Sequence, residues 1–260
     1  MTAHPLVLTI AGTDPSGGAG IQADLRAFQF LGVTGTSVIT AALAQNSTGV
    51  TAIHYLPPRI IEAQIDAVAK DAPIAAVKIG MLGNERIVSA VSERITRRKL
   101  PNVVLDPVLA AKDGRVLLTP RGIRRLISDL LPKTLIVTPN VPEAAALAQR
   151  AISTLDEARE AARIIHGHGA RWVIVKGGHW ADDTSPIDLV FDGETFVELA
   201  GDRIPGPSVR GTGCLFSASL AAYIALGTGV LDAAVKAKSF VARAITDAAQ
   251  VGKGHRIWSG

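Results

Sequence analysis

The sequence is poor in cysteine and in aromatic side chains. Its 260 residues include one cysteine, Cys214, with six Phe, three Trp and two Tyr. A single cysteine excludes an intrachain disulfide, and nothing in this usage indicates an oxidising compartment. A long basic stripe with interleaved aromatics, typical of a nucleic-acid surface, is also missing. The composition therefore favours neither a disulfide-stabilised secreted protein nor a nucleic-acid-binding one.

Long uncharged apolar runs and targeting signals are missing as well. No window of about eighteen residues is apolar and free of charge, so we expect no membrane span. Residues 1–5 lack the features of a signal peptide and lead straight into a strand-like segment. The net charge of +4 is modest, and the richest basic stretch, 94–99, falls at a predicted helix end, where cations offset the helix dipole. We therefore expect a cytoplasmic protein without membrane or nucleic-acid partners.

Short apolar runs alternate with longer amphipathic segments along the whole chain. This alternation predicts one α/β domain, residues 1–260, with a mostly parallel sheet covered by helices on both faces. The apolar runs predict buried strands at 6–10, 75–79, 103–105, 135–137 and 172–175. Helical spacing occurs at 21–31, 58–70, 85–98, 120–130 and 155–166, a hairpin is predicted at 187–199, and two helices are predicted within 215–249.

The residues that follow the predicted strands are the candidates for ligand binding. In an open parallel sheet, ligands bind beyond the carboxyl ends of the strands. These positions are polar or rich in glycine in this chain, at 11–20, 80–83, 106, 138–143 and 176–179. We therefore expect the functional site at this edge of the sheet.

The strongest signal is the run of Gly211, Thr212, Gly213 and Cys214 before a helix-like segment. Two glycines let the backbone turn tightly at a helix start, where unpaired N–H groups and the helix dipole attract an anion. A migrating phosphoryl group needs such fixed donors. Cys214 falls in the first turn, where the pKa of a thiol tends to fall, so it could accept a proton or hold the reacting group. A small buried apolar residue is the equally compatible alternative.

Carboxylate and amide side chains follow two of the predicted strands. Asp106 follows one strand directly, and Asn140 and Glu143 follow the next. Two carboxylates at adjacent strand ends can hold Mg²⁺ beside nucleotide phosphates; helix capping is the alternative. Lys176 follows a further strand, before Gly177, Gly178 and His179, and we interpret it as a phosphate contact rather than part of a plain turn.

The first strand leads into a glycine-rich loop, Gly12 to Gly20, and a helix that carries Asp24. The loop fits neither the Walker A nor the Rossmann spacing, so a small polar acceptor is the better interpretation. Gln45 ends the apolar run 38–44, and its amide offers the donor and acceptor that suit an aminopyrimidine edge. A polar turn before the next strand is the alternative for Gln45.

Taken together and in order, these motifs resemble the hydroxymethylpyrimidine/phosphomethylpyrimidine kinases. The resemblance covers residues 6–251 and rests on segments 11–25, 44–46, 78–82, 104–108, 138–144, 176–179 and 211–214. It implies a three-layer α/β/α ribokinase-like fold with a mostly parallel central sheet, and usually a homodimer. It also implies that ATP and Mg²⁺ are used to phosphorylate 4-amino-5-hydroxymethyl-2-methylpyrimidine, and then its monophosphate, in thiamine biosynthesis.

The resemblance also implies roles for individual residues. On the acceptor side, Gln45 would hydrogen-bond the pyrimidine, and the lining residues would be Gly12, Asp24, Met81 and Val108. On the nucleotide side, Asp106 and Glu143 would serve magnesium, with Asn140 and Lys176 near the ATP phosphates. The backbone of Gly211, Thr212 and Gly213 would form the anion hole, with Cys214 in the catalytic place.

Three departures from the family pattern bear on the second phosphorylation. Arg210 stands where His is usual, Leu215 where Thr is usual, and Asp113 where Ser is usual; the tail 252–260 also differs. Arg210 adds a positive charge beside the expected anion hole, which could strengthen phosphate binding or alter the preferred acceptor. Pyridoxal kinase activity, or a non-catalytic pyrimidine-binding regulator of the same fold, are the alternatives to the expected function.

Overall fold

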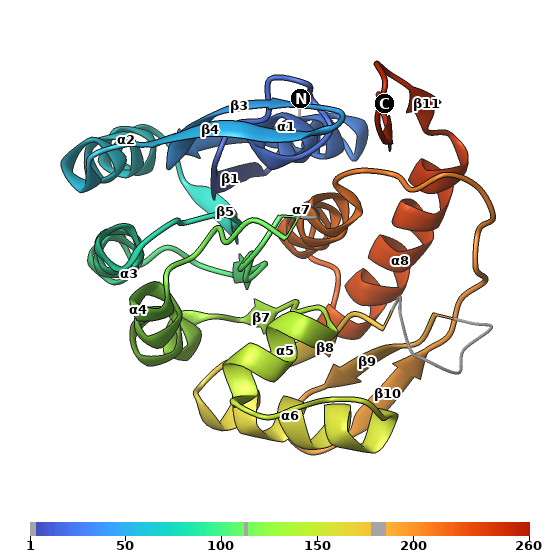
Figure 1. Cartoon of the computed structure of the whole chain (residues 1–260). Helices are drawn as coiled ribbons and strands as arrows, with labels where there is room; N and C mark the ends of the chain where they lie inside the picture. The colour runs from blue at the N-terminus through green and yellow to red at the C-terminus, as the bar shows by residue number, and fades with distance from the viewer. Residues whose placement is uncertain (1–3, 112–113, 178–185) are drawn as a thin grey trace.

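An eight-stranded sheet forms the centre of the computed structural model, which describes residues 4–111, 114–177 and 186–260 (Figure 1). The strand order is β10-β9-β8-β7-β6-β5-β1-β2. The strands from β2 to β8 in this order pair in parallel. At the other edge, β9 pairs antiparallel with β8, and β10 pairs antiparallel with β9. The strands are β1 (Leu6–Ala11), β2 (Thr34–Ile39), β5 (Ile74–Ile79), β6 (Val103–Leu105), β7 (Ile136–Val137), β8 (Trp172–Val175), β9 (Asp188–Phe191) and β10 (Phe196–Leu199).

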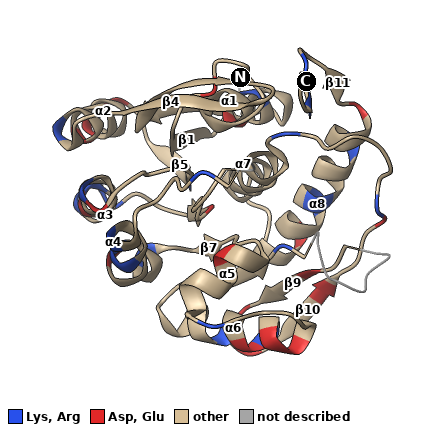
Figure 2. Ribbon diagram, in the orientation of Figure 1, with Lys and Arg blue, Asp and Glu red and all other residues tan. Residues whose placement is uncertain are grey.

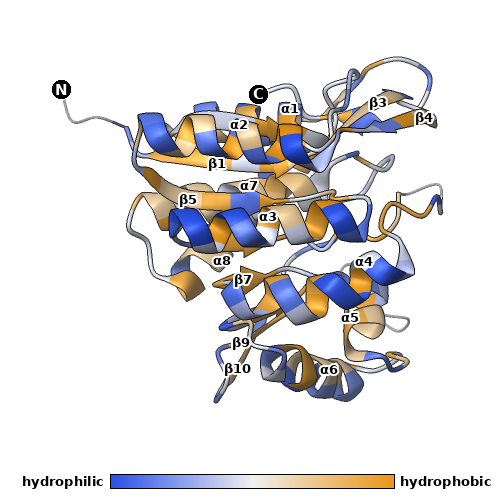
Figure 3. Ribbon diagram, turned by 90° about the vertical axis from the view of Figure 1, so that its left-hand side faces the viewer, coloured by the Kyte–Doolittle hydropathy of each residue, from blue (hydrophilic) through white to orange (hydrophobic). Residues whose placement is uncertain are grey.

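Helices cover both faces of this sheet, and a separate hydrophobic core fills each interface. Successive side chains of a strand point to opposite faces, so Ile10 of β1 packs in one core and Val7 in the other. Figure 3 looks onto the first layer, whose helices turn hydrophilic residues outward. That layer comprises α2 (Pro58–Asp71), α3 (Glu85–Arg98), α4 (Pro120–Arg125), α5 (Val141–Ala148) and α6 (Leu155–Gly167), and the second comprises α1 (Gly20–Phe30), α7 (Thr212–Ala225) and α8 (Val230–Thr246).

The predicted elements are confirmed to within one or two residues, except that α7 begins three residues before the predicted segment 215–249 and that one predicted helix is divided. The segment 120–130 begins as α4 and continues as a π-helical turn (Leu126–Leu130) and a 3₁₀ turn (Leu131–Lys133). Pro58 and Pro120 occupy the first turns of their helices, where a missing N–H costs nothing. None of the helices in the described ranges is long and apolar enough to cross a membrane.

Two small antiparallel ribbons lie outside the main sheet. The first, β3 (Ala41–Asn46) with β4 (Gly49–Tyr55), includes Gln45, so the alternative that placed this residue in a turn is wrong. The run 38–44 divides because Thr40 separates β2 from β3. The second ribbon, β11 (Ala249–Gln250) with β12 (Arg256–Ile257), belongs to the C-terminal tail. The tail returns to the first ribbon, where the amides of Gly254 and His255 donate to Ser47.

Charged residues of both signs are mixed along the outer helices (Figure 2), and among the described residues the Lys78–Asp24 ion pair is fully buried in the fold. Nζ of Lys78 in β5 lies 2.8 Å from Oδ2 of Asp24 in α1, and both side chains are fully buried. The hydroxyl of Thr9 donates to the same oxygen at 2.6 Å. Burial raises the pKa of Asp24, while the charge of Lys78 and these hydrogen bonds oppose that rise. The pair connects α1 to the sheet, and each charge depends on its partner.

We predict that Lys78→Met lowers the free energy of unfolding by about 3–5 kcal/mol, because it leaves the Asp24 carboxylate buried without an opposite charge. The measurement is urea denaturation at neutral pH. Lys70→Met, on the exposed side of α2, is the matched control and should change stability by less than about 1 kcal/mol. Equal stability of the two variants would contradict the prediction.

Candidate active site at the carboxyl ends of the strands

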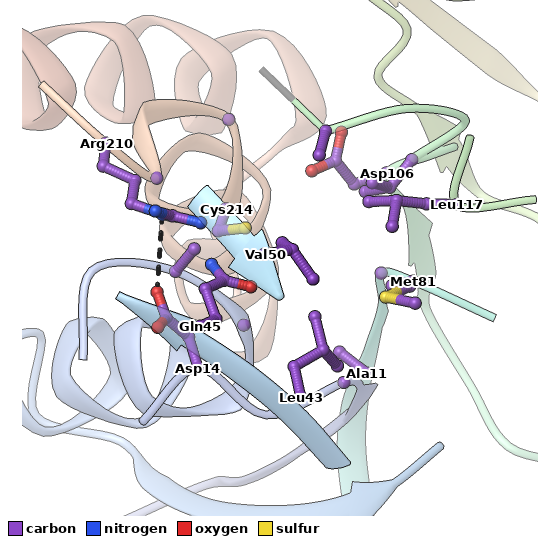
Figure 4. Close-up of a pocket in the computed structure, with 18 of the residues that line it drawn as sticks. Ala11, Asp14, Leu43, Gln45, Val50, Met81, Asp106, Leu117, Arg210 and Cys214 are labelled. Carbon is purple, nitrogen blue, oxygen red and sulfur yellow. Dashed lines mark ion pairs between the residues drawn. The ribbon is translucent and has the colours of Figure 1, made fainter. Parts of the chain in front are cut away.

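A pocket lies at the carboxyl ends of the parallel strands, where the sequence predicted a ligand site (Figure 4). Gly12 and Asp14 follow β1, Met81 follows β5, and Asp106 follows β6. The β3–β4 ribbon contributes Leu43, Gln45 and Val50, and the first turn of α7 contributes its backbone and Cys214. Segments that are far apart in the chain therefore meet around one cavity.

The entry to α7 has the backbone geometry of an anion site. Gly211 caps the helix with φ of 76°, and a Cβ atom there would lie 1.9 Å from the carbonyl oxygen of Gly18. Only glycine fits this close approach. The next amides, of Thr212, Gly213 and Cys214, belong to the first helical turn, where N–H groups have no partner within the helix. The predicted cradle is present, and phosphoryl binding in it stays a prediction.

Lys176 and Asp106 form an ion pair beside this cradle. Lys176 Nζ lies 2.8 Å from Asp106 Oδ1. A Cβ atom on Gly213 would lie 3.4 Å from that nitrogen, so the absence of a side chain keeps the cradle open to it. Burial lowers the pKa of Lys176, but the Asp106 and Glu143 carboxylates outweigh it, and the net pKa is raised. The lysine therefore carries its charge at the edge of the cradle. The predicted Gly178 and His179 lie outside the described residues.

Asn140 and Glu143 form a capping box at the start of α5. The Asn140 side chain accepts from the Glu143 amide at 2.9 Å, and the Glu143 carboxylate accepts from the Asn140 amide at 2.8 Å. The capping alternative is therefore confirmed for Asn140 and Glu143 but not for Asp106, and both capping residues also line the pocket. Burial raises the pKa of Glu143 to about 7, the nearby Asp106 charge adds to the rise, and Lys176 opposes it.

The carboxylates that remain for a metal ion are Asp106 and Glu143. The described residues contain no group of three or more His, Cys, Asp or Glu side chains that could hold a metal ion. Asp106 and Glu143 nevertheless line one pocket and repel each other, so a bound cation would relieve their repulsion. Mg²⁺ commonly uses one or two carboxylates, with water and phosphate oxygens completing its shell. The pair fits a magnesium ion that arrives with a nucleotide.

The opposite side of the pocket is an apolar wall with one amide. Met81 and Leu117 are buried there and pack with Leu43 and Val108. A Cβ atom on Gly12 would lie 3.2 Å from the Met81 sulfur, so glycine keeps this wall close to the backbone. Figure 4 shows the Gln45 amide turned toward the cavity. An apolar wall with one polar group suits a small heterocycle that is held in one orientation.

The structure does not place Asp24 on the pocket surface. Its carboxylate lies beneath the pocket in the pair with Lys78, and the lysine is the member that reaches the lining. The expectation that Asp24 lines the acceptor site is therefore wrong, because its carboxylate forms a buried ion pair with Lys78. A lysine within an apolar strand, as in Lys78, was the signal that a buried carboxylate partner was needed.

The expected fall in the pKa of Cys214 is also wrong. Burial raises the pKa of this thiol to about 11, Lys78 and the Gly20 amide oppose the rise, and Asp24 and Asp106 add to it. The helix terminus does not compensate for the loss of water around the sulfur. Cys214 is therefore a neutral thiol at neutral pH.

Sequence reasoning placed Arg210 beside the anion hole, but it missed the pairing of Arg210 with Asp14 and the contribution of His255 to the pocket. Asp14 and Arg210 form an ion pair with Nε and Oδ2 3.5 Å apart (Figure 4). His255 also lines the pocket, carried there by the C-terminal tail. No spacing could connect these residues, since they are brought together only by the folded tail. The predicted departure Asp113 lies outside the described residues.

We predict that alkylation of Cys214 by iodoacetamide accelerates about tenfold per pH unit from pH 7 to 10, without a plateau, because only the thiolate reacts. Mass spectrometry follows the reaction, and the denatured chain is the control. Its thiol should titrate near the ordinary value of about 8.5. A plateau at or below pH 8 in the folded protein would contradict the raised pKa.

Comparison with known proteins identifies the family. The model for phosphomethylpyrimidine kinase matches residues 14–258. The chain is 45% identical over 253 residues to the hydroxymethylpyrimidine/phosphomethylpyrimidine kinase of Haemophilus influenzae, covering 96% of this chain and 94% of that protein. It is 43% identical to the bifunctional thiamine biosynthesis protein ThiED of Geobacter sulfurreducens, covering 96% of this chain and 51% of that protein, about half its length.

The fold agrees with this assignment. The ADP complex of Bacillus subtilis pyridoxal kinase superposes with a TM-score of 0.92 and 34% identity, covering 99% of this chain and 97% of that one. The structure therefore has the ribokinase-like α/β fold that the sequence predicted. Its anion cradle, paired lysine and apolar acceptor wall accompany a family match over nearly the whole chain, and the chain belongs to the phosphomethylpyrimidine kinase family.

Proposed function

We propose that this chain transfers a phosphoryl group from ATP to 4-amino-5-hydroxymethyl-2-methylpyrimidine, and then to the resulting monophosphate, in thiamine biosynthesis. One observation carries the proposal: the apolar wall with Gln45 opens directly onto the α7 cradle and the Lys176–Asp106 pair. A heterocycle on the wall would present its hydroxymethyl group to a phosphate in the cradle. The relatives' names and the ADP complex of the pyridoxal kinase support the kinase activity and ATP as the donor.

The cradle would stabilise the migrating group. Phosphoryl transfer passes through a loose transition state with charge on its equatorial oxygens, so catalysis rests mainly on positioning and fixed donors. The amides of Gly211, Thr212, Gly213 and Cys214 would supply these donors, and Lys176 would add a positive charge. The side-chain oxygen of Asn140 accepts a hydrogen bond that caps α5, but the side-chain NH₂ group of Asn140 could still donate to a phosphate.

Asp106 and Glu143 would hold the magnesium ion of the nucleotide. When bound, Mg²⁺ neutralises charge on the phosphates and helps to orient them. The carboxylate of Asp106 is already held by Lys176, with the hydroxyls of Thr138 and Ser217 at 3.4 Å. This network fixes the carboxylate before the nucleotide arrives.

Cys214 would contact the acceptor hydroxyl as a neutral thiol. Its raised pKa keeps the thiol protonated at neutral pH in the unliganded protein, so it has no free lone-pair site of a thiolate with which to take the hydroxyl proton. A loose transition state requires little removal of the hydroxyl proton before the phosphoryl group moves. In this mechanism the thiol orients the hydroxyl, and late in the reaction the hydroxyl proton passes to an oxygen of the transferred phosphoryl group as the new O–P bond forms.

Pyridoxal phosphorylation is the second candidate, favoured by the 0.92 TM-score to a pyridoxal kinase. The same wall and cradle would accept a pyridine alcohol of similar size. A non-catalytic pyrimidine-binding regulator is the alternative from another class. We also propose a homodimer in the cytosol, an inference that comes from the family resemblance.

Purified protein with Mg-ATP should release ADP only when the pyrimidine alcohol or its monophosphate is added. Specificity constants for pyridoxal and pyridoxine, measured alongside, should be lower. Higher constants for the pyridine alcohols would favour the second candidate. Tight pyrimidine binding with no ADP release from any acceptor would favour the regulator and reject the kinase.

We predict that Gln45→Ala raises KM for the pyrimidine about 2- to 10-fold, the effect of losing one or two hydrogen bonds, with little change in KM for ATP. Steady-state kinetics with each substrate varied in turn provide the measurement. Gln29→Ala, at an exposed position of α1, is the control and should behave as wild type. An unchanged pyrimidine KM in Gln45→Ala would remove this contact from the proposal.

A further inference from the structure

Three cationic side chains line the pocket among the described residues, and they differ in how firmly each is paired. Lys78 and Lys176 each lie 2.8 Å from a carboxylate oxygen and donate a hydrogen bond to it. Arg210 Nε lies 3.5 Å from Asp14 Oδ2, and that buried oxygen accepts no hydrogen bond from the described residues. Of these three cations, Arg210 therefore has the weakest pairing, and an anionic ligand would add the most hydrogen bonding to it.

The guanidinium of Arg210 is held in place by the surrounding backbone. Its Nη1 donates to the carbonyl of Asn46, and its own amide donates to the Arg256 carbonyl at 2.8 Å. The aliphatic stem lies over the glycine-rich loop, since a Cβ atom on Gly18 would be 3.1 Å from Arg210 Cδ. The side chain is only 13% exposed. Three segments thus fix its position before any ligand binds, which reduces the entropy lost on binding.

Arg210 retains donors for a ligand. A guanidinium has five N–H groups in a planar fork that matches the oxygens of a phosphate. Nε and Nη1 face Asp14 and Asn46, whereas Nη2 donates to none of the described residues. Figure 4 shows the guanidinium beside Gln45 and Asp14, on the Cys214 side of the cavity. A phosphate between the α7 cradle and this fork would receive hydrogen bonds from both.

The contacts of Arg210 place it on the acceptor side of the pocket. Asp14, Gly18 and Asn46 belong to the β1 loop and to β3, the segments that border the acceptor wall. The nucleotide side is formed instead by Asp106, Asn140 and Lys176, which Arg210 does not contact. Asp14 balances the charge of Arg210 when no anion is present, so a neutral alcohol gains little from it.

Building on the proposed function, we propose that Arg210 is a specificity residue that binds the phosphate of the monophosphate acceptor. It raises the preference of this enzyme for the phosphorylated pyrimidine over the alcohol. The competing role is purely structural, a connection between the glycine-rich loop, β3 and the C-terminal tail. A structural role would affect both acceptors alike, whereas a phosphate contact would affect only one.

The test compares kcat/KM for the two acceptors at saturating Mg-ATP. Arg210→Met removes the charge and the fork, and Arg210→Lys keeps the charge alone. In Arg210→Met the ratio of monophosphate to alcohol should fall about 10- to 100-fold, the effect expected for hydrogen bonds to a charged group. In Arg210→Lys the ratio of monophosphate to alcohol should fall less than in Arg210→Met. Arg97→Met, at an exposed position of α3, makes the same change in net charge and should keep the wild-type ratio.

Arg210→His covers the case in which Arg210→Met does not fold. It introduces the residue that is usual in the family, and at pH 8.5 an ordinary imidazole is neutral. For Arg210→His at pH 8.5 we expect the same fall in the ratio of kcat/KM for the monophosphate to kcat/KM for the alcohol as for Arg210→Met. An unchanged ratio in an active variant, or equal losses for both acceptors, would overturn the proposal and leave the structural role. Failure of the wild type on both acceptors is a separate result that rejects the proposed function.

Discussion

The close approach of Gly211 to Gly18 is the contact on which the site depends. It brings the loop after β1 against the first turn of α7, although about 190 residues separate them in the chain. The loop borders the apolar wall, and the helix carries the anion cradle, so this one backbone contact sets the distance between the sites that we propose for the two reactants. A side chain at position 211 would separate them. Proximity of the reacting groups is the main contribution that such an enzyme can make to phosphoryl transfer.

Charge compensation around the pocket follows from the same packing. Lys78, Lys176 and Arg210 each face a carboxylate, and in each case the partner comes from a different segment of the chain. The Lys78–Asp24 pair is fully buried and supports the fold, whereas Lys176 and Arg210 are partly exposed, 17% and 13%, at the cavity. The full pairing of Lys78 matches the cost of burying an ion without a partner. Charges that only stabilise are deep, and charges that can exchange partners lie at the surface of the cavity.

The sequence predicted the features that depend on local pattern. Strands β1 and β5 to β10, most helices, the glycine turn at 211–214 and the clustering of Asp106, Glu143 and Lys176 followed from periodicity and from the position of polar residues after strands. Three other features depend on distant partners. The role of Asp24 is decided by Lys78, the pKa of Cys214 is decided by its burial, and the place of His255 is decided by the tail contacting Ser47. The β3–β4 ribbon was missed because its alternation of apolar and polar residues is weak.

Fold likeness alone does not separate the two candidate substrates. A pyridoxal kinase superposes on nearly the whole chain with a TM-score of 0.92, while the family match is to pyrimidine kinases. In the proposed mechanism the cradle and the Lys176–Asp106 pair would act on phosphates, so they would serve either acceptor. On this proposal, discrimination would come from the few pocket residues assigned to the heterocycle and its substituents, which are Gln45, Met81, Val108 and Arg210. Because these side chains come from four separate segments, small changes in any of them can alter the substrate while the phosphate chemistry stays the same.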